Sequence, residues 1–392
     1  MAQKDTNPYT YSDSNKRYMT YDWYMKARFG GKTAKVSLAI GCTCPNLDGS
    51  RGHGGCIYCK SGSRSAVGNT IDEQCAHGVE IACRKWKPVG FIPYFQSNTN
   101  TYGDPGILRG FYDRASAMDG AVMLDIATRA DCLSDEILEI LTETARKIPL
   151  MVELGLQTTN DRTAELINRC HTYAEFVDGY TRLKRAADTV NAEFGSAPSN
   201  DKYPPFKRFT IGVHLINGLP GETADDMRQT AADVAALHPD MVKIHLAHVL
   251  SETELAALYQ SGQYEPMTRE DYVAVTCDQL EMLPPDTIIG RVTGDGVADD
   301  GSLRGSSEIV ANRIKEEIQS RVEEAGLEIV DARITYLAYA SEIAAVMLQL
   351  AGDVVQLGET YACEIDVVAV YGIFYLAEVY ADGRLVICLL YI

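Results

Sequence analysis

The chain lacks the segments that would direct it to or across a membrane. No run of 18 apolar residues occurs among its 392 residues, so we expect no transmembrane helix. Residues 1–32 are polar and rich in tyrosine, which disfavours a secretory signal peptide. The eleven cysteines, an odd number, then favour a reducing cytoplasm with free or metal-bound thiols over a disulfide framework. We therefore predict a cytoplasmic protein.

Basic residues are scarce. The 36 Lys and Arg residues face 54 Asp and Glu residues, which gives a net charge of −18. Such a surface repels nucleic-acid phosphates on average, although a local basic patch could still bind RNA. Hydrophobic residues make up 46% of the chain, enough to bury a substantial core.

Apolar strand-like runs alternate with helical patterns between residues 35 and 250. Repeated strand–helix units imply a parallel sheet with right-handed crossovers, either doubly wound or curled into a full or partial barrel. The predicted strands are Lys35–Ile40, Gly90–Phe95, Ala121–Ala127, Met151–Gln157, Arg208–Leu215 and Met241–Leu246. The predicted helices are Thr70–Lys87, Ser134–Lys147, Tyr173–Asn191 and Glu222–Leu237.

The pattern changes after residue 250. Thr268–Glu281 and Ser307–Glu324 have helical patterns, and Thr287–Thr293 has the composition of a seventh strand. The tail from Asp331 is acidic, and its runs 373–380 and 385–392 predict a β-hairpin. We expect an N-terminal extension (1–34), a core (35–250), an extension of that core (251–328) and an acidic region of unknown role (329–392).

Three closely spaced cysteines follow the first predicted strand. Cys44, Cys56 and Cys59 have the spacing C-x11-C-x2-C, with a glycine-rich stretch between the first two. Three thiolates would leave one coordination position of a metal site open, whereas the addition of Cys42 would make a closed four-thiolate zinc site. Spacing alone does not separate these alternatives, and buried core cysteines are a third. Tyr58 favours an iron–sulfur site, because its ring could lie beside a flat adenine.

Several motifs occur in a fixed order along the chain. They are Arg28–Gly30, Cys44–Asn46 with Gly54–Cys56, Phe91–Tyr102, Ala127–Cys132, Glu153–Thr158, His214–Glu222, Lys243–His245 and Thr293–Gly296. With these motifs the chain resembles the radical S-adenosylmethionine (radical SAM) superfamily and, within it, YhcC-type proteins, relatives of the Elongator catalytic subunit and of oxygen-independent coproporphyrinogen oxidase. The resemblance covers roughly residues 15–325, but the sequence departs from the family pattern at Ala298–Ser302.

The resemblance implies a fold and a cofactor set. The expected fold is α/β, a partial (β/α)6 TIM-like barrel of the radical SAM type with a small additional C-terminal α+β region. The thiolates of Cys44, Cys56 and Cys59 would hold a [4Fe-4S] cluster whose fourth iron binds S-adenosylmethionine. An electron donor such as flavodoxin or ferredoxin would then allow cleavage to a 5′-deoxyadenosyl radical, which abstracts hydrogen from a substrate. Cys42 would be a core residue.

Other predicted site residues follow the strands, at the end of the sheet where ligands bind in such folds. By resemblance, Gln96, Ser97 and Asn98 would bind the methionyl amino group. Gly218 and Glu222 would support the cofactor backbone. Each group has a structural alternative, since a polar loop can cap the next helix and a glycine turn can simply join strand to helix.

The remaining candidates are polar residues on or just after strands. Glu153 and Gln157 lie on one face of the fourth strand, and we assign them to the ribose or the substrate. Arg129 would hold the cofactor carboxylate or a substrate anion, or would pair with Asp131 or Glu153. On the substrate side we place His245, with His214 and His248 as further candidates; Tyr58 would contact adenine or pack beneath the loop.

These observations favour a radical SAM enzyme of unknown substrate. Kinship with the Elongator subunit suggests tRNA, which the net charge does not support; a small molecule or a protein are alternatives. Two other hypotheses are a non-catalytic scaffold that binds zinc or an iron–sulfur cluster, and a simple electron-transfer protein.

Overall fold

The computed structural model describes residues 11–12, 16–60, 70–195, 205–294, 313–314, 316–318, 320–321, 355–357, 360–363, 373–379 and 385–391. The chain divides into two compact units. One contains Tyr11–Glu317, and the other contains Met1–Thr10 with Ile318–Ile392. The predicted hairpin turn at 381–383 and the glycine motif at 295–296 lie outside the described residues. The domain boundaries given above stay predictions.

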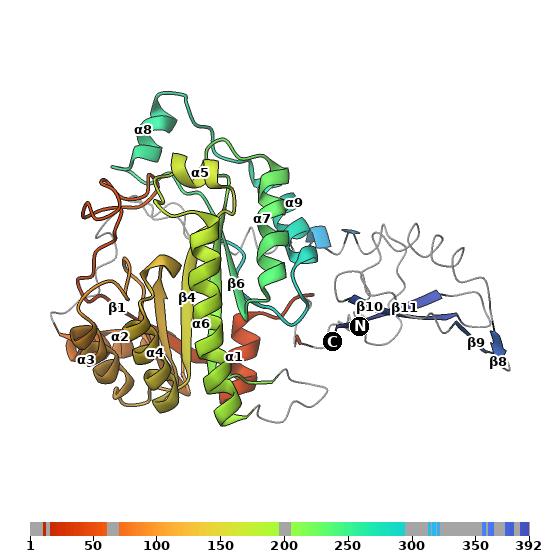
Figure 1. Cartoon of the computed structure of the whole chain (residues 1–392), viewed down its shortest axis with the longest axis horizontal. Coiled ribbons are helices and arrows are strands. Elements are labelled where there is room, and N and C mark those ends of the chain that lie inside the picture. The colour runs from red at the N-terminus through yellow and green to blue at the C-terminus, as the bar shows by residue number, and fades with distance from the viewer. Residues whose placement is uncertain are drawn as a thin grey trace. The chain divides into compact units, whose positions relative to one another are not determined.

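The larger unit is built on seven parallel strands whose spatial order follows the sequence. The sheet curls into a half-barrel with helices on its outer side (Figure 1). This confirms the predicted partial barrel and its seventh strand. The strands are β1 (Thr33–Leu38), β2 (Gly90–Phe95), β3 (Leu124–Thr128), β4 (Leu150–Gln157), β5 (Phe209–Asn217), β6 (Met241–Leu246) and β7 (Ile288–Arg291).

The helices begin at side chains that cap their first turn. The hydroxyls of Thr70 and Thr172 each accept a hydrogen bond from the backbone N–H of a glutamate three residues later, and the carboxylate of that glutamate accepts one from the threonine N–H. The helix that follows β5 begins after Thr223, so the predicted inclusion of Glu222 in that helix is wrong. The helices after β1 are α2 (Ile71–Lys85), α3 (Pro105–Ser116), η1 (Ala130–Cys132), α4 (Asp135–Lys147), α5 (Asp161–Leu166), α6 (Tyr173–Phe194), α7 (Ala224–Leu237), α8 (Glu254–Gln260) and α9 (Arg269–Met282).

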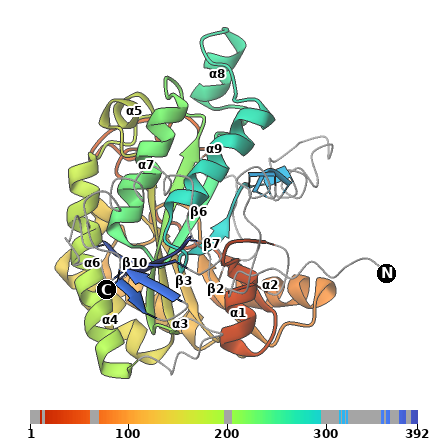
Figure 2. The same cartoon turned by 90° about the vertical axis from the view of Figure 1, so that its right-hand side faces the viewer.

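Helix α1 (Tyr21–Phe29) contacts both the first and the last strand of the half-barrel (Figure 2). Thr20 caps this helix and also forms a parallel bridge with Ile289 of β7, whose N–H donates to the Met19 carbonyl at 2.7 Å. The helix ends at Gly30, which has a φ of 77°. Residues 19–29 therefore link the two edges of the sheet.

The smaller unit contains a four-stranded antiparallel sheet. Its strands are β8 (Val355–Leu357), β9 (Thr360–Cys363), β10 (Ile373–Val379) and β11 (Leu385–Tyr391), in the order β11-β10-β9-β8. Strands β10 and β11 pair along their whole length. No helix among the described residues has both the length and the apolar character that a membrane span requires.

Candidate active site

The loop that carries the three cysteines leaves β1 and folds back on itself. The Pro45 carbonyl accepts hydrogen bonds from the backbone of Arg51 at 2.8 Å and of Gly52 at 3.2 Å. Gly49, Gly54 and Gly55 have φ values of 94°, 85° and 76°, a backbone conformation that costs glycine nothing. The glycines in this stretch are therefore explained by the shape of the loop.

Two asparagines fasten the loop to the segment after α5. The Asn168 side chain donates to the carbonyls of Gly55 at 2.7 Å and His53 at 2.8 Å. Asn46, which is buried, donates to the Asn168 carbonyl at 2.7 Å. No sequence pattern predicts a role for either residue, although Asn46 lies within the Cys44–Asn46 motif. These bonds fix the loop at the carboxyl end of β4.

The three thiols lie near one another and receive polar contacts. Asn46 Nδ2 donates to the Cys56 sulfur at 3.2 Å, and Thr99 Oγ1 donates to the Cys44 sulfur at 3.1 Å. Burial, followed by the charges of Cys56 and Cys44, raises the pKa of Cys59 to about 11. In the described ranges, no three His, Cys, Asp or Glu side chains converge closely enough to hold one metal ion. A [4Fe-4S] cluster needs no such convergence, because each thiolate bonds a different iron.

The segment after β2 is hydrogen-bonded to the segment that carries Cys42. Asn98, at a φ of 60°, donates through Nδ2 to the Cys42 carbonyl at 2.7 Å. Gln96 accepts a hydrogen bond from Ser37 at 3.4 Å, and Ser97 lies between Gln96 and Asn98, half-buried like both. Burial raises the pKa of Cys42 to about 11. The binding of a methionyl amino group by residues 96–98 stays a prediction.

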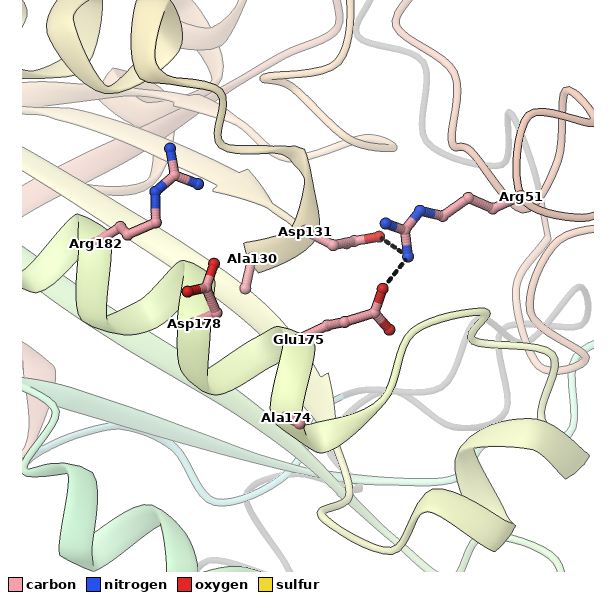
Figure 3. A pocket seen from close by; sticks show the side chains of 7 residues that line it. All are labelled: Arg51, Ala130, Asp131, Ala174, Glu175, Asp178 and Arg182. Carbon is pink, nitrogen blue, oxygen red and sulfur yellow. Dashed lines mark hydrogen bonds and ion pairs between the residues drawn. The ribbon is translucent and has the colours of Figure 1, made fainter.

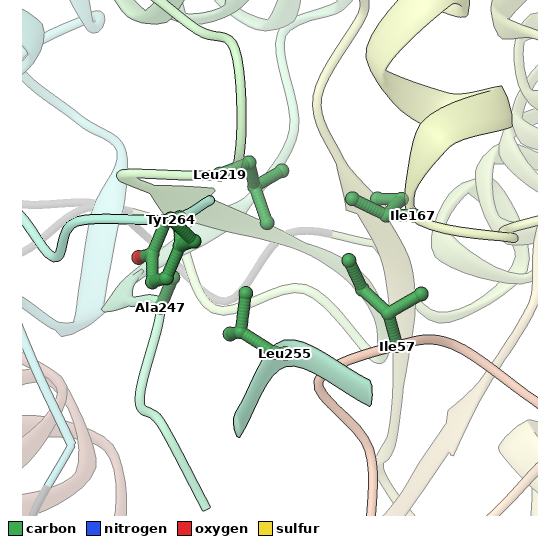
Figure 4. Packing of buried hydrophobic residues seen from close by; sticks show 6 residues of the cluster. All are labelled: Ile57, Ile167, Leu219, Ala247, Leu255 and Tyr264. Carbon is green, nitrogen blue, oxygen red and sulfur yellow. The ribbon is translucent and has the colours of Figure 1, made fainter. Parts of the chain in front are cut away.

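Tyr58 packs against an apolar cluster that joins the cysteine loop to the other loops of this end of the barrel (Figure 4). Burial is the main cause that raises the pKa of Tyr58, with the charge of Cys56 next. Packing, the structural alternative for Tyr58, is therefore present, and contact with adenine stays a prediction. The cluster consists of Ile57, Ile167, Leu219, Ala247, Leu255 and Tyr264.

The segment that contains α8 is bonded directly to the cysteine loop and to the turn after β5. The backbone N–H of Leu255 donates to the Ile57 carbonyl at 2.9 Å. The Tyr264 hydroxyl donates to the carbonyl of Gly218, which has a φ of 77°. Figure 1 shows α5 and α8 together beyond the same end of the sheet. The Gly218 carbonyl therefore takes part in a structural hydrogen bond, and the role of Gly218 near the cofactor stays a prediction.

The Arg129 guanidinium makes its hydrogen bonds to other groups of the protein. Its guanidinium makes two hydrogen bonds of 2.9 Å to Asp131, one of 2.8 Å to the Arg169 carbonyl and one of 3.0 Å to His171 Nδ1. The ion pair with Asp131, one of the alternatives given above, is therefore present. Because arginine can only donate, His171 Nδ1 accepts. Burial lowers the pKa of His171 to about 3 and keeps it neutral.

A cavity of about 480 Å³ lies beside the outer face of the cysteine loop (Figure 3). Arg51, from the loop, contacts Glu175 at 2.7 Å and Asp131 at 3.5 Å across it. Its other charged lining residues are Asp178 and Arg182. The charges of its walls already neutralise one another in large part.

Inside the half-barrel, Glu153 accepts hydrogen bonds from side chains of four other strands. The donors are Lys35 at 3.0 Å, Tyr94 at 2.7 Å, His214 at 2.9 Å and Lys243 at 2.6 Å. Its neighbours lower the pKa of Glu153 well below its ordinary value despite full burial, with Lys243 the strongest of them. Glu153 is thus the centre of a buried charge network, and a role toward ribose or substrate stays a prediction.

Asp125 extends this network. Lys35 pairs with Asp125 as well as with Glu153. Burial and the nearby Glu153 raise the pKa of Asp125 to about 7, and burial lowers that of Lys243 to about 8. The sequence analysis did not single out Asp125 or Lys35. A signal was available, because charged residues within apolar parallel strands must be paired.

The inner face of the sheet becomes partly exposed toward the carboxyl ends of its central strands. Gly155, His214, Ile216 and His245 are half-buried, while most of their outward-facing neighbours are buried; Leu246 is half-buried as well. Gln157, also half-buried, has a φ of 71° at an irregularity of the β4–β5 pairing. The barrel therefore opens at the end that carries the cysteine loop.

Glu222 lies on the turn after β5 and bonds to Thr158, which follows β4. Burial raises the pKa of Glu222 to about 7. His248 bonds through Nε2 to the Gly294 carbonyl at 3.1 Å. Both contacts join loops at the open end of the barrel.

Comparison with known proteins identifies the family of the chain. The protein YtqA of Bacillus subtilis is 40% identical over 294 residues, which cover 74% of this chain and 85% of YtqA. The protein YhcC of Escherichia coli is 30% identical over 270 residues, 68% of this chain and 80% of YhcC. The chain belongs to the radical SAM superfamily, in its YhcC/YtqA group. Residues 239–324 of this radical SAM protein match the family model for the radical SAM C-terminal domain.

A solved structure supports the fold. Elp3 of Methanocaldococcus infernus, lacking its residues 1–46, superposes with a TM-score of 0.51. The superposition covers 89% of this chain and 75% of that chain, at 16% sequence identity. The radical SAM protein therefore has the partial TIM-like barrel predicted from its motifs.

Proposed function

We propose that this chain is a radical SAM enzyme in which Cys44, Cys56 and Cys59 hold a [4Fe-4S] cluster. Such a cluster, when reduced by one electron, supplies the electron that breaks the C5′–S bond of bound S-adenosylmethionine to give methionine and a 5′-deoxyadenosyl radical. The electron would come from a flavodoxin or ferredoxin. The radical would abstract a hydrogen atom from a substrate in the open barrel.

The observation that carries the proposal is the setting of the three thiols. They lie on one loop that Asn168 and Asn46 fix at the open end of the barrel. Two of the sulfurs accept hydrogen bonds from Asn46 and Thr99, contacts that also tune the potential of iron–sulfur clusters. Donor type, hydrogen bonding and position all suit a cluster at the open end of the barrel.

The test is anaerobic reconstitution of the full chain with iron and sulfide. We expect brown protein with about four irons per chain. Addition of dithionite and S-adenosylmethionine should then produce 5′-deoxyadenosine. Cys56→Ala should lose it, while the matched variant Cys83→Ala, on the exposed side of α2, should not.

Two outcomes would favour the other hypotheses. Colourless protein with one zinc per chain would indicate a scaffold. Brown protein that takes up electrons but forms no 5′-deoxyadenosine would indicate an electron-transfer protein. Equal yields from wild type and Cys56→Ala would refute the ligand assignment.

A further inference from the structure

His245 holds a buried polar atom that has no partner. Its Nε2 makes no hydrogen bond within the part of the chain that the structure describes. Buried polar atoms are normally bonded to protein, water or a ligand. His245 lies two residues after Lys243 on the same inner face of β6, and its ring centroid lies 5.5 Å from that of His214. The atom therefore adjoins the partly exposed inner face of the barrel.

The charges around His245 are mostly positive. After burial, the groups that lower the pKa of His245 are His214, Arg291 and Lys243, and Glu153 is the group that opposes them. The negative charge of Glu153 is already shared by two ammonium groups, Lys35 and Lys243; Lys35 also pairs with Asp125, a carboxyl group whose raised pKa of about 7 reduces its negative charge. An anion that enters this space would be attracted, whereas a cation would meet two ammonium groups at close range.

Lys243 can serve a further acceptor. An ammonium carries three N–H donors, and the hydrogen bonds of Lys243 in the described structure go to the two oxygens of Glu153. One donor is thus available on the same face as His245. In the tautomer that carries its proton on Nε2, His245 supplies a second donor on that face, and two donors match the two oxygens of a carboxylate.

We infer that His245 and Lys243 bind a carboxylate group of the substrate inside the barrel, an inference that rests on the proposed function. The methionyl carboxylate of S-adenosylmethionine has the same chemistry and is the alternative source. We assign the site to the substrate because the cluster iron that would bind S-adenosylmethionine would lie at the cysteine loop. The two residues also lie on β6, away from the cysteine loop that follows β1.

The test is a titration of the reconstituted, oxidised full chain with sodium acetate as the probe, at constant ionic strength. The chain has seven histidines, so the imidazole signal of His245 can be assigned in a ¹³C-histidine NMR spectrum through His245→Gln. We expect a saturable shift of that signal with acetate and none with methylammonium. Lys243→Met should weaken acetate binding about ten-fold or more, while Lys243→Arg should retain it.

Two controls distinguish a loss of acetate binding from misfolding and from loss of the cluster. Glu153 keeps Lys35, Tyr94 and His214 in Lys243→Met, so its charge stays paired and the cluster content should equal that of wild type. His238→Asn, at a left-handed helix end that asparagine tolerates, should bind acetate normally. Absence of a saturable shift, an equal response to methylammonium, or unchanged binding by Lys243→Met would overturn the inference.

The same preparations keep this inference distinct from the proposed function. Acetate binding that persists with S-adenosylmethionine present supports a substrate site, whereas competition between the two would assign the site to the cofactor and overturn the inference. Formation of 5′-deoxyadenosine is measured in parallel. Its loss in wild type would refute the radical SAM activity, whatever acetate does.

Discussion

Replacement of Glu153 by glutamine should destabilise the barrel strongly. The change keeps the shape of the side chain but removes the charge that pairs with Lys243, whose side chain is 10% exposed while that of Glu153 is 0% exposed. Lys35 keeps Asp125, so mainly one ammonium is left without a partner. Removal of one partner from a buried ion pair costs about 3–5 kcal/mol. We expect a loss of that order in the free energy of unfolding.

The assay can observe the barrel unit alone. The two tryptophans, Trp23 and Trp86, both lie within Tyr11–Glu317, so their fluorescence during urea denaturation reports that unit. The matched control is Glu193→Gln, which breaks an exposed pair with Arg146 and should leave the transition unchanged.

A second substitution tests the cause. Lys243→Met introduced into Glu153→Gln removes the stranded ammonium and should recover part of the lost stability, a coupling of about 0.5–3 kcal/mol. If Glu153→Gln matches Glu193→Gln, or if the second substitution only adds to the damage, the charge-pairing argument is wrong.

The buried charge network, a helix contact and the cysteine loop each give one further prediction. The pKa of Asp125 is raised to about 7, so between about pH 4 and 7 the folded chain keeps a proton that the unfolded chain has lost. The free energy of unfolding should therefore fall as pH rises through this window. Asp125→Asn should remove that decline, measured as urea midpoints at each pH. Gly179→Ala places a Cβ 2.1 Å from the Ala130 carbonyl oxygen and should lower the free energy of unfolding by about 1–3 kcal/mol. The control Gly110→Ala, whose new Cβ has nothing within 4 Å, should raise it by about 0.5–1 kcal/mol in the same fluorescence assay. Asn46→Ala removes a donor to the Cys56 sulfur and should make the cluster potential more negative in an EPR-monitored titration, whereas Asn191→Ala, whose side chain bonds Phe209, should leave it unchanged; equal potentials would refute a role for Asn46.

Most of the barrel could be predicted because its strands can be recognised from local patterns in the sequence. Gly90–Phe95 and Met241–Leu246 have the predicted bounds, since apolar β-rich runs end where polar residues begin. Helix α3 was missed, although Asp104 as cap and Pro105 at the first helical position are a start signal. Helix α1 was missed as well, since its nine residues carry little amphipathic pattern.

The contacts of the candidate site were harder to predict. The four donors to Glu153 lie 59 to 118 residues away from it in the sequence, and no local pattern specifies which strands bring them together. Arg129 had Asp131 two residues away, and that nearby pair formed. The role of Asn168 depends on where α5 ends relative to a loop more than 100 residues earlier.

The bridge between Thr20 and Ile289 has a consequence for biosynthesis. A ribosome releases residues 19–29 early, yet their partner strand β7 is among the last parts of the barrel to emerge. During translation, each newly formed strand presents an uncovered edge until the next strand pairs with it, and the edge of β6 stays uncovered until residue 291 has left the exit tunnel. The nascent chain therefore exposes strand edges for most of its synthesis, and a chain truncated before β7 should depend on chaperones to avoid aggregation.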